Sequence, residues 1–340
     1  MANWRTDPDA RRRSTRRAFL TAAAAWPALA CIKAVLAQAP TKIRRIGFLG
    51  TGTAAGMASW VEALRVGLRE HGYVEGKNLA IEYRWADGKY ERAHALAAEL
   101  VQRGIEILVT HGTPGTRAAK ETTKTVPIVM AAAGDAVTIG LVASLAKPGG
   151  NVTGITIFNA EVAAKRVELI KEALPHITRF AALVNPDNPA MGPVREAMEP
   201  TAKSLKLELK YAEVRGPADL KSAFAAMVAQ KTGAVVIVED GMINANTPQI
   251  AELAVKLRLP AIGITELAEA GCLMAYGASL ADMYRRAAYF VDRILKGTRP
   301  GDIPIERAAK FETVLNLKTA TALGIKFPQS ILVQATKVIE

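Results

Sequence analysis

Three acidic residues stand at the ends of short apolar runs, where their carboxylates are placed to meet a ligand. They are Asp135, Asp240 and Glu266. A carboxylate in such a place stabilises a nearby cation, such as the ammonium group of a small solute. The same residue types also cap helices and turns, which is the alternative role for Asp135 and for Asp240 before Gly241. We expect all three carboxylates to face a positively charged ligand group.

Three threonines stand where an apolar run gives way to a helical pattern. Thr51 and Thr53 follow the first run of the body, and Thr113 lies within the segment His111-Gly-Thr-Pro-Gly115. Hydroxyl groups and free backbone N–H groups at the start of a helix make a site for an anion such as a carboxylate. Ordinary capping is the alternative for Thr53. We expect His111 itself to be a packed or surface histidine.

Asn185 and Tyr276 complete the set of candidate binding residues. Asn185 follows the first apolar run of the second half of the body, and its amide can both donate and accept hydrogen bonds. Tyr276 would supply an aromatic wall, or else pack where the chain changes lobes. Hydroxyl groups at helix starts, combined with acidic loops, fit a zwitterion such as an amino acid.

The elements that must position these residues alternate between strand and helix, which indicates a parallel, doubly wound α/β sheet. The second half of the body repeats the first element by element, so we expect two similar doubly wound parallel-sheet lobes. The expected strands cover residues 43–49, 78–85, 105–110 and 127–132, and then residues 180–184, 208–214, 234–238 and 260–264.

Ligands of open parallel sheets bind beyond the carboxyl ends of the strands, so two facing lobes would share one cleft that closes by a hinge motion. An amphipathic helix over residues 281–295 and later extended segments predict that the chain crosses between the lobes more than once. We assign residues 40–158 and about 277–302 to the N-terminal lobe. The C-terminal lobe takes residues 159–276 and about 303–340.

The first 39 residues are typical of an export signal. Thr15-Arg16-Arg17-Ala18-Phe19-Leu20, followed by a short alanine-rich segment, resembles the twin-arginine pattern. Small residues suit cleavage after Ala37 or after Ala30. Cleavage after Ala30 would leave Cys31 first, and a lipid anchor on that cysteine is the alternative to a free mature chain. We therefore expect a periplasmic protein.

Composition argues against several classes of function. Residues 1–39 carry +5 of the net charge of +12, and the remaining +7 is scattered along the body without a basic stripe, so no nucleic-acid partner is expected. Four separated histidines show no metal-ligand spacing, no cofactor is expected, and Cys272 is expected to be a buried thiol. Residues 50–55 fit the dinucleotide pattern G-x-G-x-x-A, but its later acidic residue is missing. An exported NAD(P)-type oxidoreductase is thus the alternative to a binding protein that is not an enzyme.

Several longer segments carry a family resemblance that spans nearly all of residues 42–340. The most specific are Gly140-Leu-Val-Ala-Ser-Leu-Ala-Lys-Pro-Gly-Gly-Asn-Val-Thr-Gly154 and Phe311-Glu-Thr-Val-Leu-Asn-Leu-Lys-Thr-Ala-Thr-Ala-Leu-Gly324. The body resembles the substrate-binding components of ABC uptake transporters that include tryptophan- and tyrosine-type binders. The resemblance implies a type I periplasmic-binding fold, a small-molecule solute, an inner-membrane permease as partner and a monomer. A sensory binding protein that docks on a receptor is the further alternative.

Ala136 stands where that family commonly has proline, and the loops of residues 51–56 and 239–242 are individual to this chain. These loops line the expected cleft, so the resemblance implies the fold and leaves the solute to be identified.

Overall fold

The computed structural model describes Met1 and residues 42–340 of the chain. The expected export signal, its cleavage sites and Cys31 therefore lie outside the described residues, apart from Met1. The unit Arg44–Glu340 carries the fold that is described below. No helix among the described residues is long and apolar enough to cross a membrane.

The first lobe is built on a six-stranded sheet whose strands all run parallel. Its strands are β1 (Arg44–Gly50), β2 (Leu79–Trp85), β3 (Ile107–His111), β4 (Ile128–Ala133), β5 (Val152–Thr156) and β11 (Glu306–Arg307). Their order across the sheet is β11-β5-β4-β3-β1-β2. Every residue of β3 and β4 is buried, which is the pattern of central parallel strands covered on both faces.

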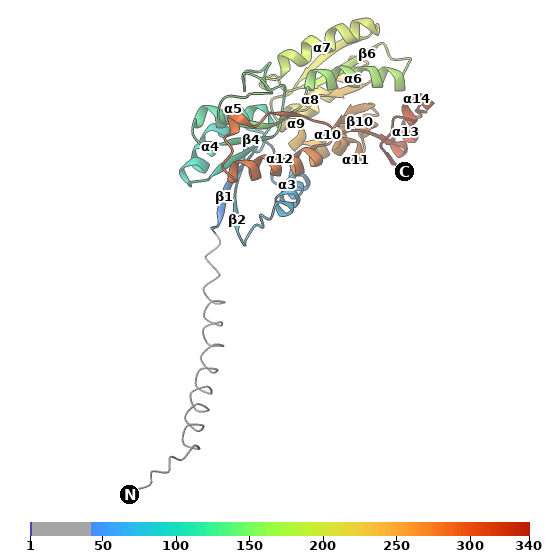
Figure 1. Cartoon of the computed structure of the whole chain (residues 1–340). Helices are drawn as coiled ribbons and strands as arrows, with labels where there is room; N and C mark the ends of the chain where they lie inside the picture. The colour runs from blue at the N-terminus through green and yellow to red at the C-terminus, as the bar shows by residue number, and fades with distance from the viewer. Residues whose placement is uncertain (2–41) are drawn as a thin grey trace. The chain divides into compact units, whose positions relative to one another are not determined.

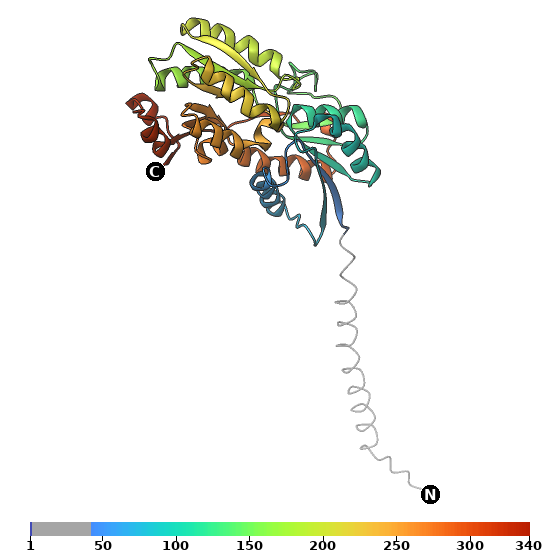
Figure 2. The ribbon, with the colours of Figure 1, turned by 180° about the vertical axis from the view of Figure 1, so that it is seen from behind.

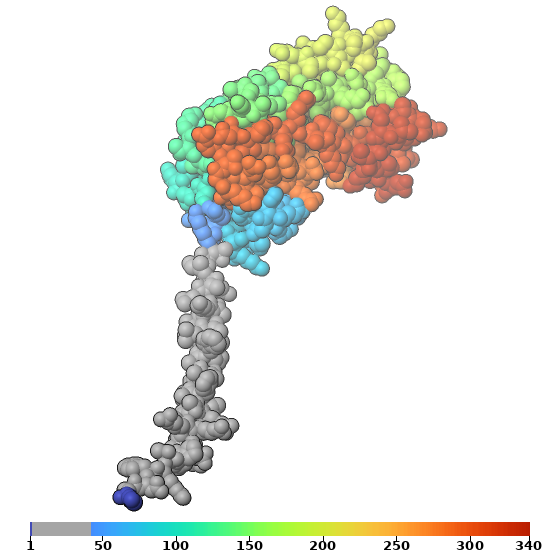
Figure 3. Space-filling view, viewed as in Figure 1, coloured from blue at the N-terminus to red at the C-terminus, as the bar shows by residue number. Residues whose placement is uncertain are grey.

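Two pairs of helices cover the two faces of this sheet (Figures 1 and 2). One face packs against α4 (Ala93–Gln102) and α5 (Gly112–Thr122), and the other against α3 (Ala58–Glu70) and α12 (Leu280–Leu295). The latter two helices lie directly against each other, as their blue and orange surfaces show in Figure 3. They approach most closely at Gly67, where an added Cβ would lie 2.3 Å from the Arg285 carbonyl oxygen.

The second lobe is built on a seven-stranded sheet in the order β13-β12-β10-β9-β8-β6-β7. Its strands are β6 (Arg179–Val184), β7 (Glu208–Glu213), β8 (Val235–Ile237), β9 (Ala261–Gly263), β10 (Met274–Ala278), β12 (Phe311–Asn316) and β13 (Lys337–Ile339). All neighbours run parallel except β10 and β12. These two pair in opposite directions because β12 enters the sheet from the first lobe.

The helices of the second lobe also divide between the two faces of its sheet. The helices α6 (Asn159–Ala173) and α7 (Met191–Ser204) bury one face, on which Phe180, Ala182 and Val184 lie. The helices α8 (Pro217–Ala229) and α10 (Thr247–Lys256) bury the other face, with Ala181 and Leu183. The shorter helices are α9 (Gly241–Ala245), α11 (Thr265–Glu269), α13 (Leu317–Leu323) and α14 (Gln329–Leu332).

The chain passes between the two sheets three times. The first passage follows β5, the second follows β10 at Ser279, and the third lies between β11 and β12. The strand β11 pairs with β5 through Glu306 and Arg307, so it belongs to the first lobe. The last passage thus lies after Arg307, a few residues beyond the boundary expected at about residue 303. An extended segment does not reveal by its sequence which of two sheets it will join.

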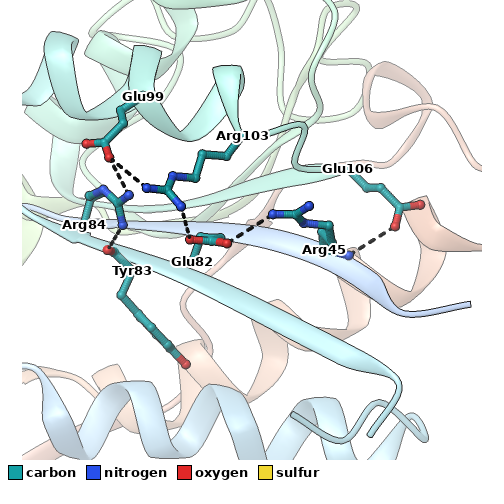
Figure 4. A network of polar contacts seen from close by, with 7 residues as sticks. All are labelled: Arg45, Glu82, Tyr83, Arg84, Glu99, Arg103 and Glu106. Atoms are coloured by element: carbon teal, nitrogen blue, oxygen red, sulfur yellow. Dashed lines mark hydrogen bonds and ion pairs between the residues drawn. The ribbon is translucent and has the colours of Figure 1, made fainter. Parts of the chain in front are cut away.

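Each of the eight strands expected from the sequence is present, with its ends within two residues of the expected ones. Charged side chains connect the edge strand β2 to its neighbour β1 and to α4, on the face of the sheet that α4 covers (Figure 4). Glu82 on β2 contacts Arg45 and Arg103, and Glu99 on α4 contacts Arg84 and Arg103. These ion pairs join α4 to the two strands at this edge of the sheet.

Candidate functional site

A small cavity, partly open to solvent, lies between the lobes at the carboxyl ends of the central strands. The first lobe contributes the ends of β3 and β4 and the start of α5, and the second lobe contributes the segment after β8 and the start of α9. Polar side chains of both lobes line it, namely His111, Thr113, Asn159, Asn188, Glu239 and Asn244. The cavity is therefore at the place that open parallel sheets use for ligands.

Three of the polar side chains that line the cavity have a buried atom without a hydrogen-bond partner. These atoms are His111 Nδ1, Asn159 Oδ1 and Asn244 Oδ1. Buried polar atoms in folded proteins almost always have a partner, because losing water without gaining a hydrogen bond is costly. Three such atoms around one cavity indicate a place where a polar ligand completes the hydrogen bonds.

Glu239 brings a negative charge to the wall of this cavity. Its Oε1 accepts a hydrogen bond of 2.9 Å from Nη2 of Arg166, a residue of α6 whose side chain is 1% exposed. Arg166 also donates to the carbonyl oxygens of Ile237 and Tyr276. The carboxylate is therefore paired with a buried guanidinium that two carbonyl oxygens hold in place.

Asp240, the next residue, is the centre of a hydrogen-bond network that joins the lobes. Its Oδ1 accepts from Asn185 and from the backbone N–H groups of Met242 and Ile243, so Asp240 caps α9. Its Oδ2 accepts from Asn188 Nδ2 at 2.9 Å and from the hydroxyl of Tyr90, which belongs to the first lobe. Burial raises the pKa of Asp240, and these donors oppose that effect. Asp240 lines the cavity, but its carboxylate is already occupied by protein donors.

The three candidate threonines have three different environments. Thr113 lines the cavity at the start of α5, and its hydroxyl oxygen accepts from the Gly134 N–H at 3.1 Å. Thr51 is fully buried with Oγ1 unpartnered, and it packs against Gly241 of the other lobe. Thr53 accepts from the Gly56 N–H within the loop that precedes α3, so it neither lines the cavity nor caps that helix. Of the three, the structure brings Thr113 to the cavity wall.

The remaining candidates lie elsewhere. The carboxylate of Asp135 accepts from the backbone of Val137 and from both the backbone and the hydroxyl of Thr138, so it closes a turn and does not line the cavity. Glu266 accepts from Trp60 Nε1 across the lobes and lines a separate groove. Burial raises the pKa of Glu266.

Tyr276 lies among the passages between the lobes rather than on the cavity wall. Its ring stacks on Phe311 with centroids 6.0 Å apart, and its carbonyl oxygen accepts from Arg166. The expected aromatic wall is absent at this position because β10 directs the ring toward the third passage. Tyr276 instead packs near a passage between the lobes, which is the alternative role expected from the sequence.

Four residues whose polar side chains line the cavity were not among the candidates from the sequence, namely Asn159, Asn188, Glu239 and Asn244. Two of them carried a usable signal. Asn188 follows Asn185 in the same loop after β6, and Glu239 precedes Asp240 in the loop after β8. Asn159 and Asn244 lie within the first turns of α6 and α9, where polar residues are common for other reasons.

His111 is packed, which is one of the two expected environments, and it also lines the cavity. It is buried at the end of β3, stacks on Trp60 with centroids 5.3 Å apart, and lines the cavity. Burial lowers the pKa of His111 to about 4. The imidazole is therefore neutral near pH 7 and contributes no positive charge to the cavity.

The depressed pKa of His111 predicts a loss of stability in mild acid. Because the unfolded histidine titrates near 6.5 and the folded one near 4, the unfolded state binds more protons between these pH values. Lowering the pH from about 7 to about 5 should therefore remove about 2 kcal/mol of the free energy of unfolding. Urea unfolding at both pH values measures this. His111→Gln is the reference, and an equal pH dependence in both proteins would contradict the prediction.

Comparison with known proteins places this arrangement in one family. A family model described as ABC transporter substrate binding protein matches residues 53–339. A tyrosine-binding protein from Clostridioides difficile (strain R20291) is 26% identical over 260 residues, which cover 76% of this chain and 74% of that protein.

Two solved structures are similar over most of this chain. A conserved domain protein from Vibrio cholerae is 29% identical with a TM-score of 0.82, over 87% of this chain and 100% of that one. A Streptococcus pneumonia protein, in complex with L-Trp, is 27% identical with a TM-score of 0.79, over 86% of this chain and 100% of that one.

These matches confirm the type I periplasmic-binding fold and the expected binding role, and they do not support the oxidoreductase alternative. The match extends through both lobes and includes the segments that meet at the cavity. The chain therefore belongs to the ABC transporter substrate-binding protein family.

Proposed function

We propose that the protein captures a small zwitterionic solute of the amino-acid type in the cavity between its lobes and delivers it to an ABC permease. The observation that carries this proposal is the set of three unpartnered atoms, on His111, Asn159 and Asn244, beside the Glu239 carboxylate. It would act by binding alone and as a monomer, since one chain supplies both walls of the cavity.

The charges around the cavity suit the two ends of an amino acid. The ammonium group would lie against Glu239 and the amide oxygens of Asn159 and Asn244, which are all hydrogen-bond acceptors. The carboxylate would lie at the start of α5, whose N-terminal N–H groups favour an anion, with Thr113 beside it. These two ends belong to different walls, so the ligand would hold the lobes together.

The relatives support the same ligand class. One of them is a tyrosine-binding protein, and another has been solved in complex with L-Trp. Aromatic L-amino acids are therefore the first compounds to test, followed by the remaining amino acids.

Thermal unfolding of the mature protein with single L-amino acids, followed by calorimetry, tests the proposal. A ligand present at about 100 times its Kd should add about 2.7 kcal/mol to the free energy of unfolding and raise the Tm. N-acetylated and desamino analogues serve as controls, since each lacks the ammonium group. If no amino acid raises the Tm or gives a binding isotherm, the proposal is wrong.

Export to the periplasm is the second part of the proposal, and it rests on the twin-arginine pattern at Arg16 and Arg17. The intact mass of the protein from the periplasmic fraction should correspond to a chain that begins at Gln38 or at Cys31. Cytoplasmic protein that keeps its full length would contradict export, and an added diacylglycerol mass at Cys31 would identify the lipid-anchored alternative.

A further inference from the structure

The ion pair between Arg166 and Glu239 has a geometry that stability alone does not require. Both side chains are buried, and one of the two carboxylate oxygens of Glu239 accepts from the guanidinium. Within the described part of the chain, Arg166 is the only recorded donor to Glu239. A carboxylate that lines the cavity with one donor retains most of its accepting capacity for a ligand.

Arg166 is held in place by rigid elements on three sides. It projects from the middle of α6, its Nη1 donates to the Ile237 carbonyl oxygen at 2.9 Å, and its Nε donates to the Tyr276 carbonyl oxygen at 2.7 Å. Gly277 leaves room for the pair, because a Cβ there would lie 3.0 Å from Arg166 Nη2 and 3.1 Å from Glu239 Oε1. The guanidinium therefore has one position, and it fixes that of Glu239.

The Glu239 carboxylate differs from that of its neighbour Asp240. Five protein groups donate hydrogen bonds to the Asp240 carboxylate, whereas Arg166 alone among the described residues donates to that of Glu239. Burial lowers the pKa of His111 to about 4, so its imidazole adds no positive charge near pH 7 that would compete with a ligand. Glu239 is therefore the acceptor that a ligand ammonium group would meet at this wall of the cavity.

We propose that Arg166 is a positioning residue that fixes the Glu239 carboxylate at the cavity wall and thereby makes the site select a protonated amino group. This inference rests on the proposed function, because it specifies how the same cavity distinguishes an amino acid from the corresponding carboxylic acid. Replacing the guanidinium changes selectivity even where the fold is retained, since the Glu239 carboxylate without it is no longer held toward the ligand.

The test measures, by calorimetry, the Kd of the best-binding L-amino acid and of its desamino analogue for each variant. In Glu239→Gln the amide oxygen still accepts from Arg166, but the charge is gone. We expect its Kd for the amino acid to rise about a hundredfold, and its Kd for the analogue to change less than about threefold. The matched control is Glu168→Gln on the exposed side of α6, which should keep the selectivity of the wild type.

Arg166→Met tests the positioning role through selectivity. The ratio of its Kd for the desamino analogue to its Kd for the amino acid should fall at least about tenfold, because Glu239 is no longer held in place. Arg166→Lys, which keeps the charge but lacks the planar fork, should restore part of the affinity. If Arg166→Met fails to fold, the double variant Arg166→Met/Glu239→Leu removes both charges and should fold but lose the selectivity.

The outcomes separate the two proposals. A wild-type protein that binds no amino acid overturns the proposed function. A wild-type protein that binds one, with unchanged selectivity in Glu239→Gln, overturns the role of Arg166 and leaves the proposed function intact.

Discussion

A single methyl group at Gly241 should lower the affinity for the ligand at least about a hundredfold, which corresponds to about 2.7 kcal/mol. Gly241 is the first residue of α9 in the second lobe. A Cβ built there would lie 2.3 Å from Thr51 Oγ1 and 2.8 Å from Thr51 Cβ, and both atoms belong to the first lobe. Since α9 begins there without a left-handed backbone, alanine is compatible with the second lobe alone.

The methyl group would therefore oppose closure of the lobes rather than folding of either lobe. Small-angle scattering should show that ligand no longer compacts Gly241→Ala, whereas it compacts the wild type. Gly192→Ala in the same lobe is the control, because no atom lies within 4 Å of its added Cβ. Thr51→Gly in the Gly241→Ala background removes both clashing atoms and should restore part of the affinity. A Gly241→Ala protein that binds like the wild type would refute this role of the contact.

Asp240→Asn should reduce the free energy of unfolding by about 2–4 kcal/mol, even without ligand. The five donors around the carboxylate come from Tyr90, Asn185, Asn188, Met242 and Ile243. Asparagine keeps one accepting oxygen at this position. Its NH₂ group would face the donors that now bind the second carboxylate oxygen of Asp240. The Asn188 amide cannot simply turn round, because its oxygen accepts from the Ala190 N–H.

Tyr90→Phe removes the hydroxyl group through which this network joins the two lobes, and so measures that contribution by itself. Burial, and then the charge of Asp240, raise the pKa of Tyr90, so its hydroxyl remains a donor at every relevant pH. Removing it should weaken ligand binding about tenfold and leave the unfolding of the ligand-free protein nearly unchanged. Urea unfolding and calorimetry on both variants measure the difference. Equal effects of the two substitutions on stability would contradict this division of roles.

The general architecture was predictable because parallel strands buried on both faces leave a strong sequence pattern. The ends of β1, β3, β4, β6, β8 and β9 were placed within two residues. These ends carry the candidate residues, so the location of the cavity followed from the pattern and the facing of the two lobes. The sequence pattern did not predict that β12 pairs antiparallel with β10, or that β11 belongs to the sheet of the first lobe. Both depend on where the chain passes between the sheets.

The choice between neighbouring residues was beyond the sequence pattern. Glu239 and Asp240 stand side by side after β8, and a pattern of residue types favours both equally. The start of α9 decides between them, because Asp240 takes the cap position and accepts from its first N–H groups. Glu239 is then left at the cavity wall. Glu266 was likewise unpredictable, since its partner Trp60 lies 206 residues away in the chain.

Tyr276 shows the same limit for an aromatic residue. Its position just before a passage between the lobes was visible in the sequence, and both of its possible roles followed from that. Which role it takes depends on the stacking partner Phe311, whose strand returns from the other lobe.

The order of the strands also sets the order in which the lobes can be completed during synthesis. The first lobe contains the first strand of the chain, yet α12 covers one of its faces and β11 forms its outer edge. A nascent chain that stops at Ala278 would expose the apolar surface that Tyr284, Phe290 and Val291 bury. The second lobe in turn waits for β12 and β13. Neither lobe can thus mature before nearly the whole polypeptide has left the ribosome.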